Sequence, residues 1–563
     1  MGASRQYWVG VGLLGFAMSC GSTPATMNSD AGVAASERAA ALEAQGEATT
    51  AALKALADAE RALAVNIAAT DEAMKVRMRL AEAASNDVRR VRETSTLDAL
   101  RSAEKSSLAV TRGIQTAPPP NLERGGPEGP AVAPPRLFTG IVATPDEIRQ
   151  LTTAEYLRGK ADKSIDEKSL LVWRRHLHQN PELSNREVET AKYIAAALRD
   201  MGLEPKTGVA HNGVVAVIKG GLPGKVVALR ADIDALPVKE EVNVPFASRA
   251  TGTYEGKTVG VMHACGHDAH VAMLLTAAKS LMTIRAELHG TVVLLFQPAE
   301  EGVPKDEKPA GAELMVKEGV LDTPKVDAVF GLHVFAGMKA GTIGYRSGPF
   351  MAAADTFEII VEGRQTHGSK PWAGVDPIVA ACAMVGSLQT IASRNVDVTD
   401  EPAVVTVGQF ESGVRNNIIP DRARLVGTVR TFNNAMRSMI HRRIREVAEH
   451  VATAHGATAK VHIETGYPVT ANNSALMEWA LPTLTRLVPG GVAQARKLTG
   501  AEDFSFYAQR VPAVFLFLGI TTESKLATAD SNHSPRFEID ESALPTGARA
   551  LAHLAIDFLL SPR

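Results

Sequence analysis

The chain has little cysteine, few aromatic residues and almost no net charge. Only three of its 563 residues are cysteines, Cys20, Cys265 and Cys382, which excludes a disulfide framework. Lys and Arg number 60 against 62 for Asp and Glu, so no basic excess favours nucleic acid as a partner. With 45% hydrophobic and 22% charged residues, the composition is that of a globular protein, and the length predicts more than one domain.

The hydrophobic run near the N-terminus, YWVGVGLLGFAMSC, begins after Arg5 and is too short for a permanent transmembrane helix. We interpret residues 1–20 as a signal segment. Its last residues, AMSC, resemble a bacterial lipoprotein signal, in which the cysteine, here Cys20, is acylated and becomes the mature N-terminus. This predicts an exported, lipid-anchored protein of the cell envelope that faces the periplasm. The alternatives are an ordinary secretory signal with an incidental cysteine and a start-site artefact.

Residues 31–111 are rich in Ala, Glu, Arg and Lys and contain no proline, which predicts helix. Their larger apolar residues fall partly on a heptad stripe, so a weak coiled coil, a single helical spacer and a solvated helix without a partner all fit. Residues 112–160 follow. Their proline- and glycine-rich part, TAPPPNLERGGPEGPAVAPPR, predicts a semi-rigid linker and the main domain boundary.

Beyond residue 160, short apolar strands alternate with helical patterns. The predicted strands are residues 214–220, 226–234, 291–298 and 327–334. Between the second and the third, HDAHVAMLLTAAKSLM carries apolar residues at helical spacing. Strands separated by such helices predict an α/β sheet that is covered on both faces.

A different pattern occupies residues 352–463. A strand, a helix, two strands, a second helix and a last strand follow one another there, which predicts a small α+β domain with one solvated sheet face. The α/β pattern then returns, with an apolar strand at 513–520 and an amphipathic helix at 541–560. We therefore assign residues 161–351 and 464–563 to one catalytic domain, which the small domain interrupts.

Polar side chains gather where strands of the larger domain end. Four segments, RADIDALP, HACGHD, QPAEEG and GLHV, offer acids, imidazoles and a thiol, and open α/β sheets place their sites at that edge. Cys265 and His267 flank Gly266, so a tight turn can present both to the same ion or to adjacent ions. Glu300 and Glu301 would repel each other without a cation nearby, and on an extended segment they point opposite ways. The combination predicts a metal-dependent site.

Seven motifs follow one another between Ser164 and the end of the chain: RADIDALP, MHACGHDAHVAMLLTAA, FQPAEEG, GLHV, HGSKPWAGVDP, NNIIPD and GAEDFSFY. Together they resemble the amidohydrolases of bacteria and plants that include hippurate hydrolases, N-acyl amino acid hydrolases and indole-3-acetyl-amino acid hydrolases. These belong to the aminoacylase and carboxypeptidase-like family of two-metal enzymes. The resemblance implies an α/β catalytic domain of the aminopeptidase/carboxypeptidase type with an inserted α+β lid domain that makes a homodimer.

The resemblance also implies a pair of divalent ions in each subunit, Mn²⁺ or Zn²⁺. Carried over position by position, the metal ligands would be Cys265, His267, Glu301, His333 and His533. Glu300 would be the general base, which takes a proton from a metal-activated water and passes it to the leaving amine. Asp232, Asp234 and Asp268 would orient imidazoles from behind, although helix or turn capping is an alternative for them.

Two lid residues acquire roles from the same resemblance. His367, in RQTHGSKP, would stabilise the tetrahedral oxyanion in a catalytic site, sometimes that of the partner subunit. Asn417, in NNIIPD, would help to bind the substrate carboxylate. The structural alternatives are a turn at His367 and a strand cap at Asn417.

Other polar residues receive structural interpretations. His441, His450 and His455 share an arginine-rich helix, which is typical of a solvated face. We interpret Cys382 as a small buried apolar residue. His270, one helical turn after a proposed ligand, is left out of the ligand set.

The sequence therefore predicts a metal-dependent amidohydrolase that removes the acyl group from an N-acyl amino acid or cleaves a related small amide. A dipeptidase or carboxypeptidase that acts on short peptides is the first alternative, because it uses the same chemistry. An inactive binding or scaffold protein of the envelope, whose helical segment carries the function, is the second. The complete set of ligand and base positions argues against it.

Overall fold

The computed structural model describes residues 145–562, with side chains from residue 153 onward. The predicted signal segment at 1–20, the helical segment at 31–111 and most of the linker lie outside these residues. Within the described part, no helix is long and apolar enough to cross a membrane. The first described helix, α3 (Pro145–Lys163), begins inside the stretch 112–160 that we predicted as linker, on a proline suited to a first helical turn.

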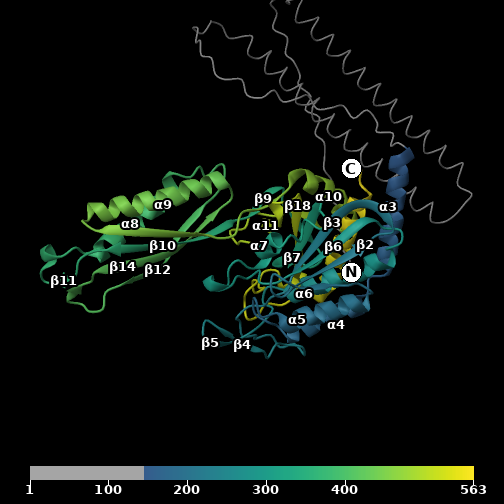
Figure 1. The fold of residues 1–563 in the computed structure, drawn as a ribbon, viewed down its shortest axis with the longest axis horizontal. Coiled ribbons are helices and arrows are strands. Elements are labelled where there is room, and N and C mark those ends of the chain that lie inside the picture. Colours follow the sequence, from purple (N-terminus) through teal and green to yellow (C-terminus); the bar gives the residue numbers. More distant parts are fainter. Residues whose placement is uncertain (1–144, 563) are drawn as a thin grey trace, which may run out of the picture. The chain divides into compact units, whose positions relative to one another are not determined.

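Eight strands form the larger sheet, in the order β1-β2-β6-β3-β7-β18-β8-β17 (Figure 1). They are β1 (Lys206–Val209), β2 (Gly213–Lys219), β3 (Leu222–Asp232), β6 (His289–Gln297), β7 (Ala328–Lys339), β8 (Ile343–Tyr345), β17 (Val492–Gln494) and β18 (Ala513–Thr521). The strands β6, β3, β7 and β18 run parallel, so their carboxyl ends meet at one edge. The five strands predicted for this domain are all present.

Helices cover both faces of this sheet. On one face lie α3, α4 (Glu167–Gln179), α5 (Val188–Asp200), α6 (His267–Thr283), α10 (Ser474–Leu487) and α12 (Leu544–Leu560), and on the other lie α7 (Gly311–Lys317) and α11 (Ser505–Ala508). Along β3, Val227 and Leu229 pack into the first core, whereas Ala228 packs into the second. Because successive strand side chains point to opposite faces, this alternation requires apolar cover on both sides, as predicted.

The small domain is an antiparallel sheet of four strands, in the order β12-β14-β10-β15, with two helices on it (Figure 1). Its elements are β10 (Ala353–Glu362), α8 (Pro377–Arg394), β12 (Val404–Ser412), β14 (Arg422–Thr431), α9 (Asn434–Ala454) and β15 (Thr458–Thr465). Buried residues alternate along β10, and Phe357 and Ile359 pack into a core with residues of α8 and α9. The order of elements and the single packed face agree with the sequence prediction.

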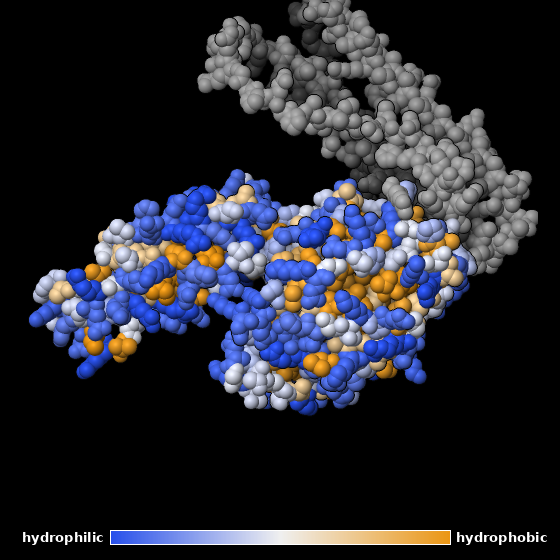
Figure 2. Space-filling model, in the orientation of Figure 1, coloured by the Kyte–Doolittle hydropathy of each residue, from blue (hydrophilic) through white to orange (hydrophobic). Residues whose placement is uncertain are grey.

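The surface of the described residues is largely hydrophilic on the face shown in Figure 2, with smaller groups of hydrophobic residues between. Two side-chain predictions in the small domain are wrong. Cys382 is exposed, because it lies on the side of α8 opposite the inward-facing Ala380 and Met384. His441 is partly buried, because its Nε2 lies 2.7 Å from the carboxylate of Asp355.

The carboxylate of Asp355, near the start of β10, lies in a buried cluster of charged side chains. This carboxylate accepts hydrogen bonds from both Nε (2.8 Å) and Nη2 of Arg437 and from the N–H of Gly466 (3.0 Å). Burial opposes ionisation of this carboxyl, yet the hydrogen bonds from Arg437 and His441 lower the pKa of Asp355 from 3.8 to about 2. The cluster therefore stabilises the fold as an ionised unit.

We expect Asp355→Asn to lower the free energy of unfolding at pH 7 by about 3 to 5 kcal/mol, because it leaves the buried Arg437 guanidinium without its counter-charge. The pKa of Asp355 is lower in the folded state, so its contribution is full above the unfolded value and is lost as the pH falls from about 4 to about 2. Urea unfolding should show the gap between variant and wild type closing over that range.

Glu362→Gln is the matched control on the same strand. Its exposed pair with Lys460, at 2.7 Å, should contribute less than about 0.5 kcal/mol. An equal loss of stability in both variants would contradict the proposed importance of the buried cluster.

Candidate active site

The proposed metal ligands come from segments at the carboxyl edge of the parallel strands. Glu301 follows β6, His333 lies within β7, and His533 lies in the long segment after β18. His267 is the first residue of α6, and Cys265 lies two residues before it. This helix is buried on almost every side and packs beside β3 and β7. Segments far apart in the sequence thus supply one site.

Gly266 makes the turn between the first two ligands. Its φ is +90°, in the left-handed region that side chains rarely adopt. A Cβ at this position would lie 2.3 Å from Cγ2 of Val334. Both the left-handed backbone conformation and the close approach of Val334 require glycine at this position. The turn directs the side chains of Cys265 and His267 toward the same site.

The structure brings all five proposed ligands together. Sγ of Cys265 lies 3.4 Å from Nε2 of His333 and 3.2 Å from Nε2 of His533. Oε1 of Glu301 lies 3.4 Å from the same nitrogen of His533 and 3.7 Å from Nε2 of His267. These four contacts link one thiol, three imidazoles and one carboxylate into a continuous cluster.

The tautomers of two histidines suit metal binding. Nδ1 of His333 donates to the carbonyl of Val334 at 2.7 Å, and Nδ1 of His267 bonds Oδ1 of Asp234 at 3.1 Å. Each ring therefore directs its Nε2 into the cluster, where this nitrogen can bind a metal ion once it carries no proton. Nε2 of His267 and Oε1 of Glu301 are buried without a hydrogen-bond partner. Such atoms are costly to bury alone, and a divalent cation would satisfy them.

Protonation in the metal-free protein follows from burial and charge. Burial, with Glu301 and Glu300 nearby, raises the pKa of the Cys265 thiol well above its usual range. Burial alone would lower the pKa of His267, but Asp232 and Asp234 raise it to about 10. Both groups hold a proton that a metal ion would displace.

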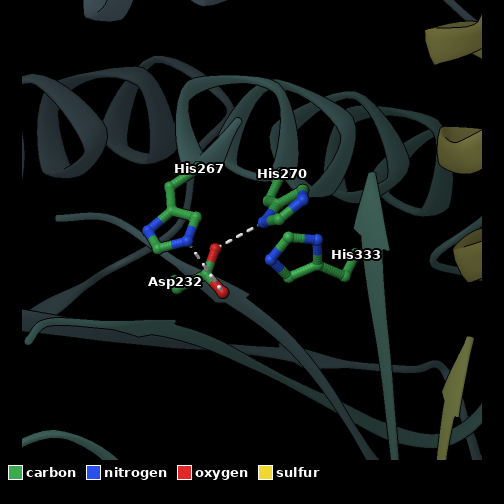
Figure 3. Close-up of side chains that lie close together, drawn as sticks. All are labelled: Asp232, His267, His270 and His333. Atoms are coloured by element: carbon green, nitrogen blue, oxygen red, sulfur yellow. Dashed lines mark hydrogen bonds and ion pairs between the residues drawn. The ribbon is translucent and has the colours of Figure 1, made fainter. Parts of the chain in front are cut away.

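Figure 3 shows Asp232 between His267 and His270, with His333 beside them. His270 uses both ring nitrogens within the protein: Nδ1 bonds Asp232, and Nε2 accepts the N–H of Val334 at 2.8 Å. Neither nitrogen of this ring therefore has a free lone pair for a metal ion, although the position of the ring would otherwise allow metal binding. Because Asp232, His267, His270 and His333 lie close enough together to hold an ion, the exclusion of His270 from the ligand set stays a prediction, which rests on these two hydrogen bonds.

The three aspartates predicted to orient imidazoles have different partners. Asp234 contacts two proposed ligands, since its Oδ2 also accepts the N–H of Glu301 at 3.0 Å. Asp232 bonds Nδ1 of His270, and its Oδ2 lies 3.8 Å from Nε2 of the proposed ligand His267. Asp268 contacts His178 at 2.9 Å and the guanidinium of Arg174 at 3.0 Å, rather than an imidazole of the ligand set.

Glu300 is buried next to the cluster but beside other acids. One carboxylate oxygen each from Glu300, Glu502 and Asp503 lie within 4.8 Å of one another. Burial and these acids raise the pKa of Glu300 well above its usual range, with Arg230 opposing the shift. Such a carboxylate has the high proton affinity that a general base for water requires.

Sequence reasoning missed two residues that organise the site. Arg230 is fully buried and donates to Asp232 at 2.6 Å and to Glu502 and Asp503 at 2.9 Å each. The sequence feature that could have identified Arg230 is the presence of a charged residue within an otherwise apolar predicted strand. Asn532 donates to the carbonyls of Cys265 and Val334 and thereby fixes the segment of the neighbouring ligand, His533. Nothing in its local sequence distinguishes it.

The two proposed lid residues, His367 and Asn417, lie in the small domain. His367 is exposed in the short strand β11 (Thr366–His367), which pairs with β13 (Ile418–Ile419), and the carbonyl of the exposed Asn417 accepts the N–H of Gly368 at 2.8 Å. Nδ1 of His367 accepts from Ser369. Within residues 153–562, no hydrogen bond or ion pair joins either side chain to the cluster.

The sequence profile of peptidase family M20/M25/M40 matches residues 228–557, more than half of the chain. The chain belongs to this family. Thermostable carboxypeptidase 2 of Saccharolobus solfataricus is 40% identical over 71% of the chain and 98% of its own length. N-acetylcysteine deacetylase of Bacillus subtilis is 39% identical over 70% of the chain and 98% of its own length.

Comparison with a solved structure supports the same family assignment for this M20 protein. The YxeP protein of Bacillus subtilis, described as a dinuclear metal-binding peptidase of the M20 family, superposes with a TM-score of 0.59 at 37% identity, covering 70% of this chain and 98% of that one. The predicted family, fold class and enzyme class are thus confirmed: this chain is a metal-binding hydrolase of amide bonds.

Proposed function

We propose that this M20 protein hydrolyses the amide bond of N-acyl amino acids. The observation that carries the proposal is the cluster of Cys265, His267, Glu301, His333 and His533, with two buried ligand atoms that lack a hydrogen-bond partner and Glu300 beside them. The deacetylase relative acts, by its name, on an N-acetylated amino acid, which supports this substrate class.

The donor set suits two divalent ions of the Zn²⁺ or Mn²⁺ type better than Mg²⁺, because it includes a thiolate and imidazoles. Bound there, such ions would supply Lewis acidity, which lowers the pKa of a water and polarises the amide carbonyl. Glu300 takes the proton of the water and delivers it to the leaving amine. Asp234 keeps the ring of His267 and the peptide of Glu301 in place during this step.

A carboxypeptidase activity on short peptides is the second candidate, favoured by the thermostable carboxypeptidase among the relatives. Both reactions are tested by one panel of N-acyl amino acids and dipeptides, offered to the purified full-length protein after metal removal and resupply with Mn²⁺ or Zn²⁺. Cleavage of the acyl amino acids supports the proposal. Cleavage of dipeptides alone would favour the peptidase, and silence on both would favour a binding or scaffold protein.

We also propose that a homodimer completes the site, with His367 and Asn417 of one subunit serving the other. Their exposed positions, with His367 on β11 and Asn417 directly before β13, support this arrangement. Mixing His367→Ala with Glu300→Gln, each inactive alone, should restore part of the activity, because mixed dimers contain one site with both residues intact. A mixture as inactive as its components would contradict the shared site.

A lipid anchor at Cys20 is the proposed means of attachment to a bacterial envelope. It is supported by the short hydrophobic run that ends at this cysteine. Cys20→Ala should release the protein from the membrane fraction, and unchanged retention would point to another anchor.

A further inference from the structure

Tyr467 lies where the chain returns from the small domain to the catalytic domain. On the catalytic side, β9 (Gly348–Met351) pairs with β16 (Thr470–Asn472), and on the other side β10 pairs with β15. Ala352 and residues 466–469 connect these two pairs, and we call them the hinge. Any rotation of one domain against the other must pass through it.

The small domain holds the backbone of Tyr467. Nη2 of Arg437, on α9, donates to the carbonyl of Gly466 at 3.1 Å and to that of Tyr467 at 3.3 Å. The N–H of Ala354 donates to the same Tyr467 carbonyl at 3.0 Å. The main chain at this residue is therefore fixed to the first strand and to a helix of the small domain.

The side chain of Tyr467 reaches the other domain. Its hydroxyl donates to the carbonyl oxygen of Glu300 at 2.7 Å, and its ring packs edge-on against Phe506, with centroids 6.1 Å apart. One residue thus contacts the small domain through its backbone and the peptide of the proposed base through its side chain.

The loop that carries the base needs such support. Ala299 has a φ of +54°, a conformation that alanine rarely adopts and that surrounding contacts must maintain. Two of those contacts come from the catalytic domain: the N–H of Ala299 donates to Glu187 at 2.8 Å, and the N–H of Glu301 donates to Asp234 at 3.0 Å. The carbonyl between them is held by Tyr467 alone among the hydrogen bonds of residues 153–562.

We propose that Tyr467 is a positioning residue, through which the hinge sets the place of Glu300 and Glu301. The proposal rests on the proposed function, because it assigns these two residues to the base and to a metal ligand. It implies that the orientation of the small domain and the geometry of the base are coupled through one hydroxyl group.

The test compares Tyr467→Phe with Tyr507→Phe in the full-length, metal-loaded protein. Tyr507 is the matched control, because its buried hydroxyl donates to Sδ of Met315 at 3.2 Å and does not contact the loop. For Tyr467→Phe we expect kcat to fall about ten- to a hundredfold, with KM within about twofold and both metals retained. Hydrogen exchange at the amides of Ala299 and Glu301 should accelerate about tenfold, the equivalent of one lost hydrogen bond.

The outcomes of this comparison support or overturn the proposed role of Tyr467. A fall in kcat together with faster exchange in Tyr467→Phe, and neither in Tyr507→Phe, supports the proposal. Unchanged exchange in the 299–301 loop overturns it whatever the activity, as does an equal effect in both variants. If the wild-type protein hydrolyses no amide while exchange still accelerates in Tyr467→Phe, the proposed function fails and the positioning role stands.

Discussion

Glu300→Gln should lower kcat for amide hydrolysis by about 10²- to 10⁴-fold while the bound metal stays in place. The amide has nearly the same shape as the carboxylate but cannot accept the proton of a water. Glu300 contributes to none of the contacts that link the cysteine, the histidines and Glu301, so its loss leaves the ligand set complete.

Rates and metal content measured on the same preparation check this result. Glu313→Gln, which removes a partly exposed carboxylate on α7 that pairs with Lys317, serves as the control and should retain activity. Retained hydrolysis in Glu300→Gln would contradict the assignment of Glu300 as the general base. Loss of metal would instead make Glu300 a ligand.

Metal removal should abolish hydrolysis, and Cys265→Ala should prevent its full recovery on resupply. Sγ of Cys265 lies between His333 and His533, so its loss removes the contact that joins two imidazoles of the cluster. We expect the metal content of the variant to fall and kcat to drop by at least about 10³-fold, because the Lewis acidity needed for the reaction goes with the ion.

Two readouts are independent of activity. The metal-free protein should gain about 2.7 kcal/mol of stability when metal is added at about one hundred times its Kd. Because the thiol of Cys265 and the rings of His267 and His533 all have raised pKa values without metal, binding at pH 7 should release at least about two protons, and affinity should increase with pH. Calorimetry in two buffers of different ionisation enthalpy measures this release. Binding without proton release would contradict ligation by these groups.

The fold could be predicted because its signals are local. Period-two and helical patterns identified five of the eight strands of the larger sheet, the four strands of the smaller sheet and the helices α6, α8, α9 and α12, and the return of the α/β pattern after residue 463 identified the insertion. Individual burial was predicted less well. Cys382 was expected inside and His441 outside, since a helix pattern gives the packed face only to within one or two positions, and the neighbour that draws His441 inward, Asp355, is 86 residues away.

The sequence by itself determined that acids, imidazoles and a thiol lie next to strand ends, where parallel strands bring them to one edge, and the family resemblance implied which of them bind metal and which carboxylate acts as base. Only the tertiary structure decided how they are held. Arg230 meets acids 272 and 273 residues away, and Tyr467 reaches Glu300 across 167 residues. Such partners carry no signal in the local pattern, because hydrogen bonds between distant segments depend on how the sheets, the hinge and the long segment after β18 pack together.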